Sequence, residues 1–196
     1  DVCSSDLEAI NRTNNVIANL DVVDDGIRDR IEGEAKFIRG IIYFELVRVY
    51  GKAWNDGDPA SNLGVPLVLE PTESITEESF VSRNTVQQVY QQVITDLTDA
   101  KNLLPASNGF FANTYAASAM LSRVYRQQGN WTGARDEASR VITDGSYSLV
   151  GTYVDAFANS SNTSEDIFAI QVTSQDGVND MNTFYAPDAD GGRGDV

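Results

Sequence analysis

The sequence contains no histidine, and this absence removes whole classes of active site. Ser-His-Asp triads, Cys-His dyads and most catalytic zinc centres depend on an imidazole. A single cysteine, Cys3, allows no disulfide framework. No apolar run approaches the roughly 18 residues that a membrane-spanning helix needs. The commonest forms of nucleophilic and zinc catalysis are therefore excluded.

Positive charge is scarce too, because 14 Lys and Arg residues face 29 Asp and Glu residues and the formal charge is −15. A phosphate-backbone binder needs a basic patch, so the sequence argues against a nucleic-acid partner. Carboxylates are abundant, but no two of them stand out as the pair that glycoside hydrolysis would need. We therefore predict no enzyme activity, no catalytic residue, no metal site and no cofactor.

The two ends of the chain differ from the rest. Residues 1–7 resemble one reading frame of a sequencing adapter, so we expect them not to be native. The alternative is a natural segment in which Cys3 is the acylated cysteine of a lipoprotein. The tail from Asp188 to Val196 is rich in glycine and aspartate and has no terminating element, which suggests that the protein continues.

Helical periodicity dominates residues 8–150. It is visible over 8–24 and stronger over 27–50, where Ile27, Ile38 and Val49 belong to the predicted apolar stripe. Charged side chains of the second helix, Arg39 among them, are assigned to its exposed side. Three further helices are delimited by capping and stop signals and cover 84–104, 114–128 and 131–143. Those signals are Thr85 with Gln88, Pro105, Asn113, Gly129, Asn130 and Gly145.

Two segments break the helical pattern. Residues 51–83 hold three of the five prolines and predict a long irregular connection, interrupted by the apolar run 65–69. Connections of this length are usually functional or disordered. Residues 166–172 alternate, so that Phe168, Ile170 and Val172 would share one face of a half-buried strand.

The helix pair at 114–143 fits the tetratricopeptide pattern, in which small residues let paired helices approach closely. The matching residues are Leu121, Tyr125, Gly129, Trp131, Ala134, Ala138 and Val141. In this pattern Trp131 is predicted to be a core residue. The helices at 27–50 and 84–104 would form a second unit. We predict a mainly all-α fold with repeats over 8–150, a loop insertion at 51–83, and a loop and β segment over 151–196.

Four stretches resemble the SusD/RagB family of surface glycan-binding lipoproteins, through their order and spacing rather than any single motif. They are residues 10–17, 34–51 followed by 64–68, 83–90 through 103–105, and 129–131 with 164–168. Full-length members of that family are more than twice as long. The resemblance implies that this chain is the helical-repeat half of such a protein, without its anchor and its C-terminal half.

The resemblance also implies a role. Such a protein is a non-catalytic subunit, lipid-anchored on the extracellular face of the outer membrane in its full-length form. It captures oligosaccharide for a SusC-like TonB-dependent transporter, and RagB-like relatives capture peptides instead. The alternative is a plain tetratricopeptide scaffold that binds a protein partner. Such an array would have a short turn in place of residues 51–83.

Sugar-binding sites combine aromatic platforms with amide and carboxylate groups that bind hydroxyls. The best candidate in this sequence is the loop that follows the helix at 27–50. It carries Trp54 in a polar, glycine-rich setting, with Asn55, Asp56 and Asp58 beside it. Trp54 would either stack on a ligand or anchor the loop by packing beneath it. The acidic spacing does not match an EF-hand calcium loop.

Overall fold

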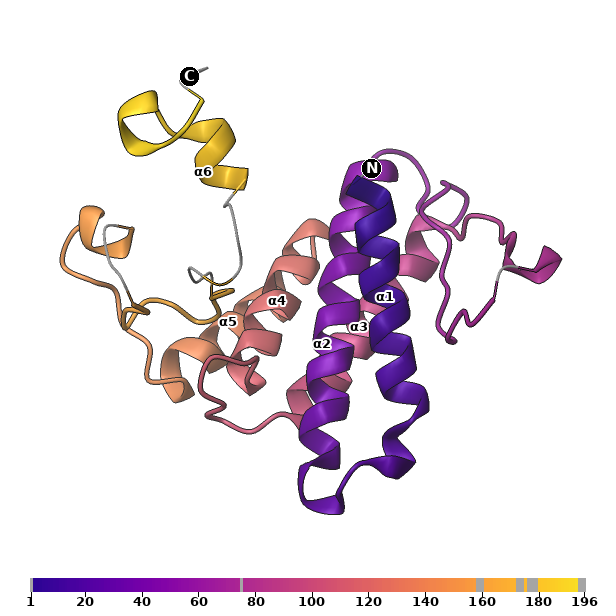
Figure 1. Ribbon diagram of the computed structural model, residues 1–196, viewed down its shortest axis with the longest axis horizontal. Helices are drawn as coiled ribbons and strands as arrows, with labels where there is room; N and C mark the ends of the chain where they lie inside the picture. The colour runs from indigo at the N-terminus through magenta and orange to yellow at the C-terminus, as the bar shows by residue number, and fades with distance from the viewer. Residues whose placement is uncertain (1, 75, 158–160, 172–174, 176–179, 194–196) are drawn as a thin grey trace.

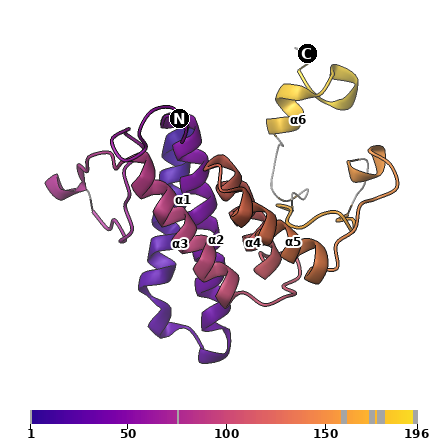
Figure 2. The same ribbon diagram turned by 180° about the vertical axis from the view of Figure 1, so that it is seen from behind.

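The computed structural model describes residues 2–74, 76–157, 161–171, 175 and 180–193, and helices dominate this part of the chain. The α-helices are α1 (Val2–Ala18), α2 (Asp25–Tyr50), α3 (Val86–Leu103), α4 (Thr114–Gln127), α5 (Trp131–Asp144) and α6 (Asp180–Tyr185). The 3-10 turns are η1 (Leu20–Val22), η2 (Glu77–Ser79), η3 (Val154–Ala156) and η4 (Asp188–Asp190). Helices α1 to α5 pack as successive up-and-down neighbours, whereas α6 lies apart from them (Figures 1 and 2). This arrangement confirms the mainly all-α, tetratricopeptide-like fold.

The predicted caps define the ends of α3, α4 and α5. Thr85 and Gln88 form a reciprocal capping box. The Asn113 side chain accepts hydrogen bonds from two backbone N–H groups of α4, and that of Asn130 accepts one from Gly133. Each cap satisfies donors that have no partner inside their helix. Gly129, at φ +73°, lets the chain reverse between α4 and α5.

The first helix differs from its predicted range. It begins at Val2, inside the segment expected not to be native, and ends at Ala18. Residues 20–22 then form a 3-10 turn, because the N–H groups of Val22 and Val23 each bond three residues back, at 3.3 and 3.2 Å.

Helix α2 is central, since it contacts α1, α3 and α4. The predicted stripe was therefore wrong in part: Ile27, Ile38 and Val49 are exposed. A helix with several neighbours buries more than one face. The buried residues of α2 include Ala35, Phe37, Tyr43, Phe44, Leu46 and Val47.

The assignment of Arg39 to the exposed side was also wrong, because this residue is only 5% exposed. Its guanidinium donates to both carboxylate oxygens of Asp96 on α3, at 2.9 and 2.7 Å, and to Asn14 Oδ1 on α1 at 2.9 Å. The planar guanidinium matches a carboxylate in this two-bond geometry. One buried ion pair thus joins the first three helices.

The irregular connection after α2 is fixed to the helices. Val65 is buried, and an antiparallel bridge joins Leu63 to Thr85. The Tyr43 hydroxyl donates to the carbonyl of Val68 and accepts from its N–H, both at 2.8 Å. Asn14 donates to the same carbonyl at 2.9 Å. Burial raises the pKa of Tyr43 above its usual value.

The predicted strand does not form over 166–171, and Val172 lies outside the described residues. Phe168 packs edge to face against Phe37, with ring centroids 5.1 Å apart, while Ile170 is 80% exposed. A strand needs hydrogen bonds to the backbone of a neighbouring strand. The hydrogen bonds described nearby join Ser148 to Ser164, which comes before this segment in the sequence. The alternation of apolar residues was therefore not enough to predict a strand.

Trp131 does not belong to the core, because it is 69% exposed. It is the first residue of α5, and of the described side chains in this helix only Val141 is buried. The α4–α5 hairpin itself is as expected, and Ser122 donates across it to the Ala134 carbonyl at 2.8 Å. Among the described elements, nothing packs on the face of α5 that carries Trp131.

Candidate functional site

The candidate loop, residues 51–62, follows the end of α2 and lies against the start of α3. The N–H groups of Val86 and Gln87 donate to the carbonyls of Asn62 and Pro59, both at 2.9 Å. These N–H groups belong to the first turn of α3, where a helix has no internal acceptors for them. The loop therefore docks on the N-terminus of α3.

Arg83 fastens both ends of this loop. Its Nε donates to the Gly64 carbonyl at 2.6 Å, and its terminal nitrogen donates to the Tyr50 carbonyl at 2.8 Å. The same nitrogen is 3.3 Å from the Leu63 carbonyl. One side chain thus joins the last turn of α2 to the segment that returns toward α3.

Trp54 is half-buried and packs on the core. Its ring centroid lies 5.0 Å from that of Tyr90 on α3, at a tilt of 59°. Tyr90 is itself buried against Phe44, and burial raises the pKa of its hydroxyl. Trp54 therefore anchors the loop with part of its ring, and only the remainder is accessible to a ligand.

The polar residues beside Trp54 are exposed. The carboxylate of Asp58 accepts hydrogen bonds from the Ala60 N–H at 3.0 Å and the Ser61 hydroxyl at 3.2 Å, so it shapes the turn. The side chains of Asn55 and Asp56 make no hydrogen bond to other described residues. The exposed side chains of Asn55 and Asp56 are therefore available to bind hydroxyl groups.

A hollow of about 460 Å³ opens beside the loop. Its lining residues are Tyr50, Gly51, Lys52, Ser61, Asn62, Leu63 and Arg83. Trp54 is not among them, so the structure places the aromatic ring and the hollow on the same loop without bringing them together. Tyr50, Asn62 and Arg83 were missed in the sequence, because only the folded loop brings them to one place.

The chemistry available at this loop is hydrogen bonding and stacking. Over the described ranges, no three Asp, Glu or Cys side chains come close enough together to hold a metal ion. In the same part of the chain, none of the helices has the length and apolar character required to cross a bilayer.

Comparison with known proteins points to one group. A SusD-like family model, described as starch-binding and associating with the outer membrane, matches residues 5–126. SusD-like protein P25 of Formosa agariphila is 26% identical over 155 residues, 76% of this chain and 27% of its own length. A SusD-like protein of Bacteroides ovatus is 25% identical, with the same two shares. The chain thus spans about a quarter of these curated relatives.

Solved structures of SusD-like proteins also match this chain. A SusD superfamily protein from Bacteroides thetaiotaomicron matches with a TM-score of 0.78 and 32% identity, over 88% of this chain and 39% of that one. A laminarin-binding SusD-like protein matches with a TM-score of 0.66 and 26% identity, over 80% of this chain and 34% of that one. The helical arrangement described above is therefore shared with these proteins.

Proposed function

The chain belongs to the SusD-like family of starch-binding proteins that associate with the outer membrane, and from this premise we propose that it helps to bind oligosaccharide without cleaving it. The family match over residues 5–126 is the observation that supports the proposal most strongly. The loop chemistry is consistent with it, because an anchored indole, a free amide and a free carboxylate suit a polyhydroxylated ligand.

We assign the binding site to the loop at 51–62. Trp54 would present the accessible part of its ring to the apolar face of a sugar, while Asn55 and Asp56 bind hydroxyl groups. Asp58 would act indirectly, since its carboxylate holds the turn. The adjoining hollow would receive the next sugar unit along the chain of the ligand.

The same proposal extends to the setting in which the protein works. The full-length protein would be lipid-anchored at the extracellular face of the outer membrane. There it would pass its ligand to a SusC-like TonB-dependent transporter. The known relatives include a laminarin-binding protein, so β-glucan oligosaccharides belong in the first set of ligands tested, beside starch fragments and peptides.

The test is calorimetric titration of the chain with laminarihexaose and maltohexaose. Replacing Asn55 and Asp56 together by alanine should weaken binding at least tenfold and leave the melting temperature unchanged, because both side chains are exposed. Asp29→Ala is the matched control, since Asp29 is equally exposed but lies near the start of α2. An unchanged dissociation constant after the double replacement would contradict the site.

Trp54→Ala separates the two roles of this residue. Loss of its packing on Tyr90 should lower stability, and loss of its accessible surface should lower affinity. Trp54→Phe keeps an aromatic ring against Tyr90 and should restore most of the stability but not all of the affinity. Chromatography of the incubated hexaoses should show no shorter products, and cleavage would refute the non-catalytic role.

A further inference from the structure

A second hollow, of about 420 Å³, lies far from the loop at 51–62. It is enclosed by the loop between α3 and α4, the turn after α5, and the segment from Asn162 to Ala169. The loop at 51–62 docks on the first residues of α3, whereas this hollow adjoins the loop that follows its last residues. Helix α3 has 18 residues and is therefore about 27 Å long. The two hollows belong to opposite ends of that helix.

Two phenylalanines stand on the rim of the second hollow. Phe110 and Phe111 are 68% and 62% exposed, which is unusual for adjacent aromatic residues in a short loop. The loop itself is fixed, because Asn108 Nδ2 donates to Glu34 Oε1 at 2.8 Å and to the Ala112 carbonyl at 2.7 Å. The rings are therefore presented on a pre-organised backbone, and a ligand would lose little by ordering it.

The floor of the hollow is polar. The hydroxyl of Tyr147 accepts a hydrogen bond from Asn113 Nδ2 at 3.0 Å, so its own proton can be donated to a ligand. Its ring meets that of Tyr115 edge to face, with centroids 6.2 Å apart. The exposed carboxylate of Asp144 also lines the hollow and makes no hydrogen bond or ion pair to other described residues. A donor and an acceptor thus stand near the aromatic rim.

The turn that carries these groups is strained. Ser146 has φ +59°, and within the described ranges it is the only residue other than glycine with a positive φ. Such a conformation costs about 1 kcal/mol or more and is concentrated at functional sites. At Gly145 a Cβ atom would lie 2.6 Å from the Tyr147 ring, so the ring rests directly on this backbone. The turn thereby fixes the position of Tyr147 in the hollow.

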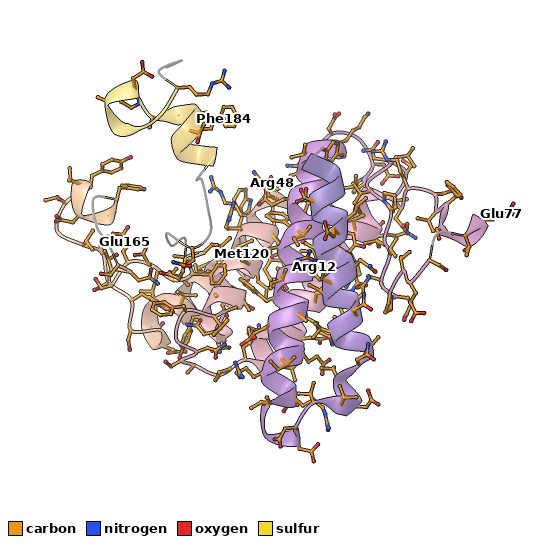
Figure 3. All side chains as sticks on the ribbon, in the orientation of Figure 1. Arg12, Arg48, Glu77, Met120, Glu165 and Phe184 are labelled. Carbon is orange, nitrogen blue, oxygen red and sulfur yellow. The ribbon has the colours of Figure 1, made fainter. Side chains whose placement is uncertain are left out.

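Phe110 and Phe111 also border a neighbouring groove of about 360 Å³, which is mainly apolar. Phe37, Ile38, Phe168 and Ile170 line it. The segment that contains Phe168 and Ala169 lines both the hollow and the groove. It is held by Glu165, labelled in Figure 3, whose carboxylate accepts from the Val150 N–H at 3.1 Å. The two rings thus have a polar hollow on one side and an apolar groove on the other. A pyranose has the same division, with a C–H face and a rim of hydroxyls.

The charge of the hollow restricts its ligand. No described Lys or Arg lines it, whereas Asp144 and Asp166 do. Arg140 lies 5.1 Å from the Tyr115 ring, but its donors are bound to Thr114 and Ser118. The charged side chains that line the hollow are thus carboxylates alone, so anionic ligands such as uronic acids and sulfated sugars are disfavoured.

We propose that this second hollow binds a neutral sugar unit of an oligosaccharide, stacked on Phe110 or Phe111 and hydrogen-bonded to Tyr147 and Asp144. The proposal rests on the proposed function, because it assumes that the protein binds carbohydrate. It adds a second point of attachment and a selection against anionic sugars. Two sites at opposite ends of α3 would hold a long glycan more tightly than either site alone.

The test starts from the chain with Asn55 and Asp56 replaced by alanine, which weakens binding at the first loop. Titration with laminarihexaose and maltohexaose should still show binding. Adding Phe110→Ala and Phe111→Ala should weaken that residual binding at least tenfold. Phe80→Ala is the matched control, since Phe80 is 82% exposed on a different loop, and it should change nothing.

Reversing the charge of Asp144 gives a second test, because a change in ligand preference would not be expected if Asp144 had only a structural role. In the same background, hexagalacturonate should not bind, and Asp144→Lys should make it bind. Residual binding that survives loss of both phenylalanines would overturn the second site alone. A dimer that forms through these phenylalanines, or peptide binding without sugar binding, would overturn it too. If the unsubstituted chain binds no saccharide, the proposed function fails first and this inference fails with it.

Discussion

The bundle of α1, α2 and α3 and the hairpin of α4 and α5 use the same local signals but differ in burial. Helices α2 and α3 bury large side chains along most of their length, whereas α5 buries Val141 and exposes Trp131 and Ile142 at 69% and 75%. Both regions have capped helices with apolar periodicity. The difference lies in the number of neighbours, since α2 has three contacting helices and α5 packs mainly on α4. Position in the stack therefore decides which apolar residues become core.

The two regions also differ in how deeply their ion pairs are buried. In the bundle, Arg39 and Asp96 are almost fully buried and bonded to each other. Where the hairpin meets the bundle, Lys101 on α3 and Glu137 on α5 form a partly exposed pair, and one oxygen of Glu137 is buried without a hydrogen-bond partner among the described residues. Disturbing the first region should therefore cost much more than disturbing the second.

The largest expected effect comes from Asp96→Ala. It leaves the buried guanidinium of Arg39 without its carboxylate, and breaking such a pair typically destabilises a protein by about 3–5 kcal/mol. Urea unfolding followed by circular dichroism measures the loss. Asp99→Ala is the control, because the Asp99 carboxylate is 41% exposed in its pair with Lys36 and should lose at most about 1 kcal/mol. Equal losses of unfolding free energy for the two variants would show that the buried ion pair matters no more to stability than the exposed one.

An intermediate effect is expected for Gly40→Ala at the α2–α3 interface. The new Cβ would lie 3.0 Å from Cγ of Leu97, a fully buried residue with no room to move, and overpacking of this kind costs about 1–3 kcal/mol. Gly133→Ala in α5 is the matched change, since its Cβ would meet the exposed Asn130 side chain at 2.9 Å and the half-buried Tyr125 ring at 3.0 Å. The loss at Gly133 should be smaller in thermal unfolding. A larger loss there would show that the hairpin is the more tightly packed region.

The smallest effect is expected for Trp131→Ala. An exposed residue away from special features usually changes stability by less than about 0.5 kcal/mol, whereas a core Trp→Ala change costs about 3–5 kcal/mol. Leu121→Ala on α4 is the buried counterpart and should cost about 2–5 kcal/mol. Denaturant midpoints of the two variants give the comparison. A large loss at Trp131 would restore its predicted place in the core.

Sequence patterns were sufficient where the determining interaction is local. The capping box of Thr85 and Gln88 and the caps at Asn113 and Asn130 lie within three residues of the groups they bind, so the starts of three helices could be predicted. Arg39 could not be placed, because its partner Asp96 is 57 residues away and polarity alone suggests exposure. The alternation at 166–172 failed for a similar reason, since it specifies a face but not a partner strand.

The candidate site shows the same division. Its aromatic and polar residues stand next to one another in the sequence, so the loop could be chosen. The choice between platform and anchor for Trp54 needed Tyr90, which comes from another helix. Phe110 and Phe111 carry no signal of their own, because their significance depends on remaining uncovered in the fold.

Arg83 gives the loop at 51–62 a freedom that an ordinary interhelical connection lacks. Because one guanidinium binds the carbonyls of Tyr50, Leu63 and Gly64, the two ends of the loop are held together independently of its exposed side chains. Exposed loop tips with small or polar residues tolerate changes well. Evolution, or a protein engineer, can therefore replace the exposed side chains of the loop, Asn55 and Asp56 among them, while Trp54 stays packed on Tyr90 and the helical frame is unchanged.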